Sequence, residues 1–386
     1  MIFCDSYLPG YKGGGGMWAV YNLADRLKDD FDFFIFTRDC DGKLDQTPFV
    51  HAARDKWNER PEAKVFYASP AKLNRNSIES LVDEVSPDLI YLNSVFSYVC
   101  VKFLMMRRKS RTRSGTVLLA PCGEFANAAL KIKSAKKRSF LAFARISNLF
   151  DGICWRASSN AEHSEIRAIA GNDVPIEISP ELTPKVLFPD FDILEKPEKE
   201  VGAVRLACYS HITPKRNLLF LIECLKQIKT GTVELEIVGP TDDEAYLRSC
   251  MEAASRLPPN IDVHFAGGKT CEEGLSMLIE NHFVVFPTHN ENFSNVIIES
   301  LAAGCPLIVS DQIVWKEAED LPFITRNSLD DPAAWVRSLN ESVMMNGDIF
   351  RERSLAARQF AVRWLEAHDS FAICRGMLNR IFEGNK

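Results

Sequence analysis

Short apolar runs alternate with amphipathic stretches along most of the chain. Apolar runs of four to eight residues are typical of buried strands, and hydrophobic residues three or four apart are typical of helices. The predicted strands cover 1–5, 31–37, 64–69, 88–93, 116–121, 152–158, 176–182, 204–210, 233–239, 262–267, 282–288 and 306–311. The predicted helices include 17–30, 77–85, 217–228, 244–257, 271–281 and 296–304. This alternation predicts an α/β protein built from βαβ units with parallel sheets.

The pattern is interrupted once and then restarts. The segment 183–203 is rich in proline and charge and has no clear period, which is typical of a linker. A length of 386 residues also favours two domains. From residue 331 onward the pattern is helical only. We therefore predict an N-terminal domain over 1–188 and a second domain over 189–367. A C-terminal helix over 368–386 is assigned to the N-terminal domain by the family resemblance described below.

Composition excludes several classes of protein. The hydrophobic fraction of 46% and charged fraction of 25% are those of a soluble globular protein. A net charge of −6 does not indicate a nucleic-acid partner. Eleven cysteines without a C-x-x-C pair predict reduced, mostly buried thiols. The N-terminus has no signal-peptide pattern and no apolar run is long enough to span a bilayer, so we expect a cytoplasmic protein.

One region is strongly basic. Twelve Lys and Arg residues and a single acid, Glu124, lie between Lys102 and Arg145. This excess favours contact between the region 102–145 and an anionic membrane surface or a phosphate-bearing lipid carrier. An ordinary solvated face is the alternative. The first interpretation predicts a protein that is peripheral on the inner face of the membrane.

Candidate sites lie in loops that follow strands. Open α/β sheets bind ligands beyond the carboxyl ends of their strands, and two such domains would face each other across a cleft. The loops that fit this rule are 9–17, 92–97, 120–125, 209–217 and 287–295.

The loop 287–295 and the helix after it combine two carboxylates with a helix start. Ser294 and Asn295 are good helix N-cap residues, and Gly304 with Pro306 predicts the helix end. Exposed N–H groups at a helix start bind anions such as phosphate. Glu291 before the helix and Glu299 on its second turn could each accept hydrogen bonds from sugar hydroxyls, which is the layout of a nucleotide sugar. Alternatively, both carboxylates merely favour the helix start and face water.

Other chemistry-bearing residues give weaker signals. Gly13–Gly16 form a loop whose amides can approach a ligand and lead into a helix, or a flexible linker. No histidines lie at metal-ligand spacing, and His264 is expected to be packed inside a strand. Asp39 and Asp41 are expected in a solvated loop. The sequence therefore predicts no metal site.

The stretch from Thr288 to Asp311 resembles the signature of the retaining, E-x7-E glycosyltransferases of family 4, which have the GT-B fold. The segments 208–225, 12–27, 120–138 and 310–315 resemble further features of this family, the last two those of a bacterial exopolysaccharide and lipopolysaccharide subgroup. The resemblance implies two Rossmann-like βαβ domains facing across a cleft, with a helical C-terminal tail. It also implies a nucleotide-sugar donor, in the form of a UDP- or GDP-sugar, and no metal or other cofactor.

The resemblance assigns roles to individual residues. Glu299 would contact the donor ribose, and Glu291 would lie near the donor sugar and the leaving diphosphate. The backbone of Asn292, Phe293 and Ser294, with Asn295, would hold sugar or phosphate oxygens. The family's Arg and Lys that grip the diphosphate map to His211 and Arg216, with Lys215 beside them. On the acceptor side, the resemblance points to Gly14, Gly15, Gly16 and Glu124.

Four positions depart from the family pattern. His211 replaces Arg, Ser294 stands where Gly is common, Cys122 stands where the subgroup has Arg, and Arg156 stands where His is common. Arg216 can bind phosphate bidentately as well as Lys or better, whereas a neutral His211 is the weaker replacement. Lys215 would compensate by turning inward. A solvated Lys215 is the alternative.

Three functions are open at this point. The first is a retaining hexosyltransferase that moves a sugar from a nucleotide-diphosphate sugar to a growing, lipid-linked glycan in polysaccharide biosynthesis. The second is a catalytically impaired GT-B protein that acts as a binding or partner subunit, for which His211 and Ser294 are the arguments. The third, a sugar-nucleotide epimerase, fits the E-x7-E context less well.

Overall fold

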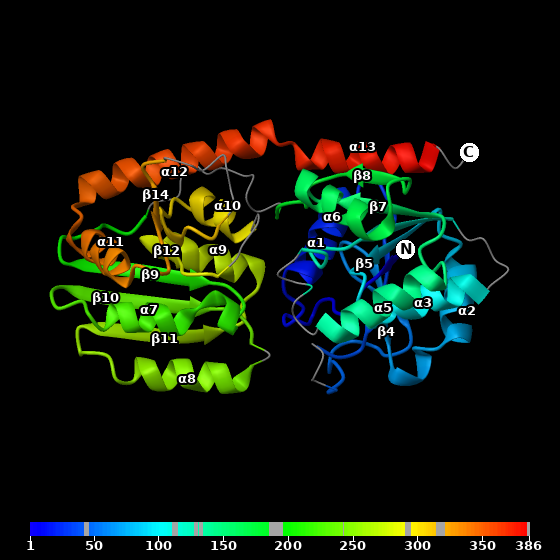
Figure 1. Cartoon of the computed structure of the whole chain (residues 1–386), viewed down its shortest axis with the longest axis horizontal. Coiled ribbons are helices and arrows are strands. Elements are labelled where there is room, and N and C mark those ends of the chain that lie inside the picture. Colours follow the sequence, from blue (N-terminus) through cyan, green and yellow to red (C-terminus); the bar gives the residue numbers. More distant parts are fainter. Residues whose placement is uncertain are drawn as a thin grey trace. The chain divides into compact units, whose positions relative to one another are not determined.

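The computed structural model describes residues 1–41, 46–109, 115–126, 130, 134–184, 196–241, 243–289, 295–313 and 321–383. The chain divides into two compact units (Figure 1). Unit 1 comprises Met1–Lys185 and Asp369–Lys386, and unit 2 comprises Val186–His368. The predicted domain boundary was placed at 188, and the predicted return to the first domain at 368.

Unit 1 contains an eight-stranded sheet in the order β3-β4-β2-β1-β5-β6-β7-β8. All neighbours run parallel except β3, which is antiparallel to β4. Its strands are β1 (Ile2–Phe3), β2 (Phe34–Arg38), β3 (Trp57–Glu59), β4 (Lys64–Ala68), β5 (Leu89–Asn93), β6 (Thr116–Ala120), β7 (Ile153–Ala157) and β8 (Ile176–Ile178).

Helices cover both faces of this sheet because alternate strand residues point to opposite sides. Phe3, Ile90 and Val117 pack on one face with α2 (Arg75–Val85), α3 (Tyr98–Lys109), α5 (Ser134–Ile146) and α6 (Asn160–Ala170). Ile2 and Tyr91 pack on the other face with α1 (Gly14–Leu27) and α13 (Ser370–Glu383). The strands are therefore hydrophobic on both sides, as buried parallel strands are.

Unit 2 contains a six-stranded parallel sheet in the order β11-β10-β9-β12-β13-β14. Its strands are β9 (Ala203–Tyr209), β10 (Thr232–Val238), β11 (Ile261–Gly267), β12 (Phe283–Phe286), β13 (Leu307–Ser310) and β14 (Ile324–Asn327). The order reverses between β9 and β12, which is the point where open α/β sheets bind ligands.

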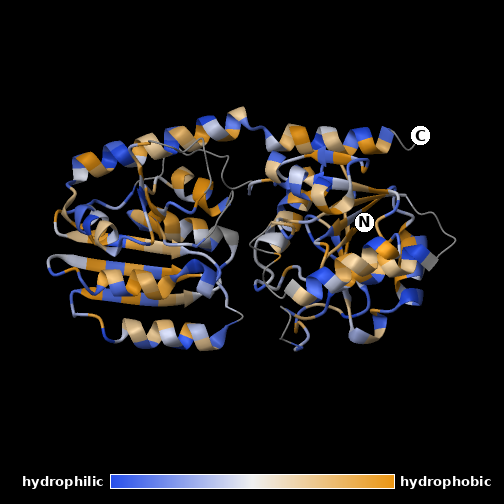
Figure 2. Cartoon of the chain, viewed as in Figure 1, coloured by the Kyte–Doolittle hydropathy of each residue, from blue (hydrophilic) through white to orange (hydrophobic). Residues whose placement is uncertain are grey.

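Two layers of helices flank the unit 2 sheet. Leu206 and Val285 pack with α7 (Leu218–Leu225), α8 (Glu244–Ala254) and α11 (Pro332–Met344). Ala207 and Val284 pack on the opposite face with α9 (Cys271–Glu280), α10 (Asn295–Ala302) and α12 (Gly347–Ala367). Figure 2 shows α7 as almost entirely hydrophobic, whereas α12 carries mixed hydrophobic and hydrophilic residues.

Sequence patterns predicted most of these elements, and the helix-only tail is confirmed by α11, α12 and α13. Two strands were missed. Trp57–Glu59 is a three-residue edge strand, and Ile324–Asn327 carries three polar residues in four, so neither gives a clear period. His264 was predicted to be packed inside a strand, which is wrong: it lies in β11 but is exposed.

The predictions about thiols and membrane spans can be compared with the structure over the described residues. Eight of the ten described cysteines are buried and none is disulfide-bonded, which confirms the predicted reduced thiols for this part of the chain. None of the helices in the ranges given above is long and apolar enough to cross a bilayer.

Candidate functional site

The loop after β9 and the loop after β12 are joined directly to each other. The backbone carbonyl of Lys215 accepts hydrogen bonds from the His289 amide at 3.0 Å and the Thr288 hydroxyl at 3.3 Å. The Ser310 hydroxyl in turn donates to the Thr288 carbonyl at 2.6 Å. Three loops at the carboxyl edge of the unit 2 sheet are therefore held together where the strand order reverses.

Close backbone packing fixes the same loop from the other side. The Ser210 and Ile212 amides donate to the carbonyls of Val238 and Pro240 at 2.9 and 2.8 Å. A Cβ atom at Gly239 would lie 1.9 Å from the Ser210 carbonyl oxygen, so only glycine fits there. Backbone contacts thus help to position the loop that carries His211, Lys215 and Arg216.

The three predicted diphosphate-binding cations differ in exposure. Arg216 is half-buried, with its guanidinium 5.7 Å from the centre of the Phe286 ring and Nη1 3.5 Å from the Thr288 hydroxyl. His211 is also half-buried, while Lys215 is exposed. Of the three, Arg216 is the cation held against the end of β12, and so against the turn that leads toward α10.

Helix α10 ends where the sequence predicts. Its described residues are Asn295–Ala302, and they are followed by Gly304 with a φ of 73°. The Cys305 amide donates to the Ser300 carbonyl at 2.9 Å, and a Cβ at Gly304 would lie 2.7 Å from the Ser354 hydroxyl. Glycine is therefore required both for the left-handed turn and for the contact with α12.

Glu299 lies on the second turn of α10 and is half-buried. Burial raises its pKa from 4.5 to about 7. Its carboxylate makes no hydrogen bond or ion pair with any residue in the described part of the chain. Buried carboxylates normally accept hydrogen bonds from N–H or O–H donors, and Glu299 has none among the described residues. The hydroxyl groups of a ligand could supply such donors.

The other donor-side predictions are only partly visible. Asn295 is the first residue of α10, and its Oδ1 is buried with no hydrogen-bond partner among the described residues. Glu291, Asn292, Phe293 and Ser294 lie outside the described residues. The described part therefore contributes Arg216, His211, Lys215, Asn295 and Glu299 to this edge.

In unit 1, carboxylates hold the loops at the corresponding edge of the sheet. Asp41 accepts hydrogen bonds from the amides of Tyr11 and Lys12 at 2.8 and 3.1 Å, and a Cβ at Gly10 would clash with its carboxylate. Asp39 pairs with Arg54 at 2.6 Å. The prediction of a solvated loop for both aspartates is therefore wrong: both are buried, and Asp41 shapes the loop that leads to α1.

The predicted glycines form the start of α1. Gly14 has a φ of 61° and opens the helix, and the Gly16 carbonyl accepts a hydrogen bond from the Asn93 side chain at 2.9 Å. A Cβ at Gly15 would meet no atom within 4 Å. The helix start therefore faces open space at Gly15 and is anchored to β5 at Gly16.

Glu124 and Glu162 also bind backbone amides. Glu124 accepts from the Ser94 hydroxyl and the Val95 amide at 2.8 Å each, and burial raises its pKa in spite of these bonds. Glu162 accepts from the Gly123 amide at 2.6 Å and from the Ser158 amide and hydroxyl at 2.7 Å. Sequence reasoning missed Glu162, although a glutamate in the first turn of a helix after a strand is a recognisable signal.

Two of the departures from the family pattern have local explanations. Cys122 has a φ of 54°, and its thiol lies 3.3 Å from Asn93 Oδ1. Arg156 is buried and donates to the Tyr91 hydroxyl at 2.8 Å and to the carbonyls of Ser179 and Pro180 at 3.2 and 2.7 Å. Arg156, on β7, thus links β5 to the segment that follows β8.

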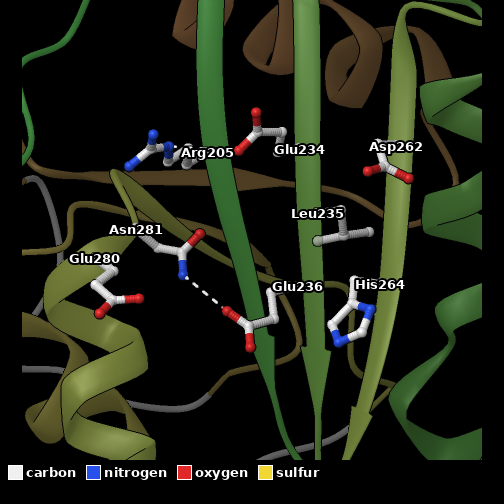
Figure 3. Close-up of a pocket in the computed structure, with 8 residues that line it drawn as sticks. All are labelled: Arg205, Glu234, Leu235, Glu236, Asp262, His264, Glu280 and Asn281. Carbon is white, nitrogen blue, oxygen red and sulfur yellow. Dashed lines mark hydrogen bonds and ion pairs between the residues drawn. The ribbon is translucent and has the colours of Figure 1, made fainter.

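A separate hollow of about 310 Å³ lies on an open face of the unit 2 sheet (Figure 3). Glu234 pairs with Arg205 at 3.4 Å, and Glu236 accepts from Asn281 at 3.4 Å. These residues lie along β9, β10 and β11 rather than beyond their carboxyl ends, and the ionic groups already pair with each other. The candidate site is therefore not this hollow. Among the described residues, no group of three His, Cys, Asp or Glu side chains could hold a metal ion.

A family model matches part of unit 2. Residues 203–341, within unit 2, match the family model described as Glycosyl transferases group 1. No curated protein sequence matches the chain significantly.

Solved structures resemble the whole chain. Sucrose-phosphate synthase from Thermosynechococcus elongatus has 17% identity and a TM-score of 0.71, with 100% of this chain and 99% of that chain covered. HepE from Anabaena, in complex with UDP and glucose, has 14% identity and a TM-score of 0.66, with 98% of each chain covered. WaaG, a glycosyltransferase involved in lipopolysaccharide biosynthesis, has 11% identity and a TM-score of 0.63, again with 98% of each covered.

These similarities establish the fold, which is GT-B, with two parallel-sheet units and a C-terminal helix. Together with the matched domain they support a glycosyltransferase enzyme.

Proposed function

We propose that this protein is a retaining glycosyltransferase that moves a hexose-type sugar from a nucleotide-diphosphate sugar to a growing, lipid-linked glycan in polysaccharide biosynthesis. The observation that carries the proposal is Glu299, a half-buried carboxylate without a described partner on the second turn of α10. Two vicinal ribose hydroxyls would supply the hydrogen bonds that this carboxylate lacks.

The groups around α10 suit a leaving diphosphate. The helix start at Asn295 presents N–H groups to an anion, and Arg216 can bind a phosphate through two parallel hydrogen bonds. Lys215 and His211 lie on the same short loop. These cations and dipoles would offset the charge that develops as the glycosidic bond to the diphosphate breaks, so the proposal needs no metal ion or other cofactor.

The proposed donor is a UDP- or GDP-sugar. HepE, which shares the fold, has been crystallised with UDP and with UDP-glucose. Glu291 would lie near the transferred sugar. The acceptor hydroxyl would attack on the face from which the diphosphate leaves, and the departing phosphate would take its proton, which gives retention of configuration.

The proposed lipid-linked acceptor rests on the surface of α3 and α5. Arg138 and Arg145 on α5 are exposed, and on the same helix Phe143 and Ile146 are 45% and 85% exposed. On α3, exposed Tyr98 lies under Lys102, whose Nζ is 5.2 Å from the ring centre. Basic residues interleaved with exposed aromatic and aliphatic ones favour the surface of an anionic bilayer. WaaG acts in lipopolysaccharide biosynthesis, which is chemistry of this kind.

A thermal-shift screen tests the donor. UDP, GDP and their sugars bind only the folded protein, so the correct ligand raises the melting temperature. We expect one nucleotide family to stabilise the wild type and Glu299→Ala to abolish the shift. A wild-type protein that none of the ligands stabilises would contradict the proposal, and an unchanged shift in Glu299→Ala would contradict the ribose assignment.

Sedimentation with liposomes tests the membrane surface. We expect binding to vesicles that contain phosphatidylglycerol, little binding to pure phosphatidylcholine, and loss of binding in Phe143→Ser with Ile146→Ser. Equal binding to both vesicle types, or none, would remove this part of the proposal.

A catalytically impaired GT-B protein remains the second candidate, because His211 replaces the family's Arg beside the diphosphate. A panel of nucleotide sugars separates the two. Nucleotide binding without hydrolysis or transfer of any sugar would favour the binding subunit.

A further inference from the structure

A second carboxylate without a described partner lies in unit 1. Glu181 follows β8 by three residues and is half-buried. None of the hydrogen bonds or ion pairs in the described part of the chain uses its side chain. It lies at the carboxyl edge of the unit 1 sheet, where open α/β sheets bind their ligands.

The backbone on both sides of Glu181 is clamped by side chains from other elements. Arg156 donates to the carbonyls of Ser179 and Pro180 at 3.2 and 2.7 Å. On the other side, Asn22 of α1 donates to the Leu182 carbonyl at 3.0 Å, and Arg26 donates to the Thr183 carbonyl at 3.3 Å. Four carbonyls around Glu181 are therefore fixed, which orients its side chain before any ligand arrives.

Arg156 also explains why Glu181 has no ion pair with the residues that the structure describes. The guanidinium lies close enough to interact electrostatically with Glu181, but its N–H groups point to two carbonyls and to the Tyr91 hydroxyl. The positive charge is thus near, while the donors are directed elsewhere. Burial, only partly offset by Arg156, raises the pKa of Glu181.

The surroundings of Glu181 are those of a small polar site. After burial, the charge of Glu181 has the largest effect in raising the pKa of the Cys122 thiol. That thiol contacts Asn93, and the Asn93 side chain donates to the Gly16 carbonyl at the start of α1. Gly15, one residue earlier, faces open space. The residues come from three strand ends and the start of α1, as in a ligand site rather than a packing contact.

We propose that Glu181 binds the acceptor by accepting hydrogen bonds from hydroxyl groups of a neutral sugar. This inference rests on the proposed glycosyltransferase function. A neutral, hydroxylated acceptor fits because Glu124, Glu162 and Glu181 are carboxylates at this edge, and an anionic sugar phosphate would be repelled. Glu181 is a binding residue here, and the diphosphate still leaves from the α10 side.

The test uses the full-length protein, two glycosides and two variants. Methyl β-D-glucopyranoside offers hydroxyl donors, whereas its tetra-O-methyl derivative keeps the oxygens but has none. Binding is followed by saturation-transfer NMR, with and without the nucleotide that the thermal-shift screen selects. We expect the wild type to bind the first glycoside and not the second. Glu181→Gln should weaken that binding about tenfold, because a hydrogen bond to a charged group is lost.

Glu165→Gln is the matched control, since Glu165 is also half-buried in unit 1 and its pKa is also raised by burial. It should leave glycoside binding unchanged. Glu181→Gln should keep nucleotide binding within twofold and should not lower the melting temperature, whereas a purely structural carboxylate would lower it when neutralised.

Three results would overturn the inference: equal binding of the two glycosides, an affinity in Glu181→Gln within twofold of the wild type, or no glycoside binding by a wild type that binds nucleotide. A wild type that binds no nucleotide would instead contradict the proposed function. In that case the comparison of the two glycosides without nucleotide would still test whether Glu181 binds sugar hydroxyls.

Discussion

At the scale of single residues, two half-buried carboxylates, one in each unit, are the most informative feature. Glu299 and Glu181 lie in different units, each at a sheet edge and each without a described partner. Burying a carboxylate without donors lowers stability at neutral pH, since the ionised form loses its hydration. Natural sequences tolerate such a loss mainly where a ligand restores the missing hydrogen bonds.

Nucleotide-sugar affinity should depend on pH through Glu299. Its pKa of about 7 means that the Glu299 carboxyl of the free protein is largely protonated at pH 6 and largely ionised at pH 8. Ribose hydroxyls favour the ionised form, so affinity should rise about tenfold between these pH values. Isothermal titration with a UDP- or GDP-sugar, whose diphosphate does not titrate in this range, measures the change.

Glu299→Gln is the control for this dependence and should bind more weakly and with a flat profile. Because the folded-state pKa is raised above 4.5, ionisation destabilises the fold as pH rises through the interval from 4.5 to about 7. The Gln variant should therefore melt higher than the wild type at pH 8. A wild-type affinity that is constant from pH 6 to pH 8 would refute the assignment.

Gly239→Ala should strongly destabilise unit 2. The new Cβ would overlap the Ser210 carbonyl at 1.9 Å, and the φ of 151° is strained for any other residue. We expect a loss of at least about 3 kcal/mol in the free energy of unfolding, measured by urea titration. Gly15→Ala, where a Cβ meets nothing, should be neutral or slightly stabilising. Similar effects from both changes would contradict this account.

Sequence analysis located the helix that carries Glu299, because a cap residue and a Gly-x-Pro end are local signals. It misread Asp41 and missed Glu162, since their partners are the amides of Tyr11 and Gly123, which are distant in sequence. Which carboxylates face solvent and which hold loops is decided by tertiary contacts, and no periodicity encodes that.

At the scale of elements, acidic side chains hold the loops at the unit 1 sheet edge through hydrogen bonds to backbone amides. Asp5 accepts from the Ser97 hydroxyl and from the Val99 amide at the start of α3, at 2.8 and 3.0 Å. Asp41, Glu124 and Glu162 hold three further loops in the same way. Amide groups that are already bonded to these carboxylates are not available to bind an anionic ligand, which favours the proposed phosphate site in unit 2.

Replacing Glu162 should loosen the loop at Gly123. In Glu162→Gln one acceptor oxygen becomes an NH2 group facing an N–H donor, so we expect a loss of about 2 kcal/mol in stability. Hydrogen exchange in residues 121–126 should become faster. Glu165→Gln serves as the control on the same helix, and equal exchange in the two variants would show that Glu162 does not hold the loop.

The order of strands and helices followed from sequence because buried parallel strands and amphipathic helices have distinct periods. The short edge strand Trp57–Glu59 and the polar strand Ile324–Asn327 were missed because sheet pairing, rather than their own composition, makes them strands.

At the scale of the whole molecule, α13 is separated in sequence from the unit that it completes. Cys374, Met377 and Leu378 are buried in the same core as Leu23 of α1 and Tyr91 of β5. An ion pair between Arg380 and Glu177 at 2.7 Å adds a contact at the surface. The predicted assignment of a C-terminal helix to the first domain came from the family resemblance, since helical periodicity alone does not show which core a helix joins.

Substitutions in α13 should therefore destabilise unit 1 selectively. Met377→Ala with Leu378→Ala removes two buried side chains, each of which contributes about 2–5 kcal/mol. Hydrogen exchange resolved by segment should accelerate in β1, β5 and α1 and stay unchanged in β9–β13. Ile373→Ala, at an exposed position of the same helix, is the control. Equal acceleration in both units would show that the effect is not confined to unit 1.

The late position of α13 has a consequence during synthesis on the ribosome. The whole of unit 2 is translated between the two segments that make up unit 1. A nascent chain thus exposes the apolar residues of α1 and β5 that share a core with α13 until α13 itself has been translated, whereas unit 2 can already close. A product released before α13 is made would keep those residues uncovered, which makes it a ready target for chaperones and proteases.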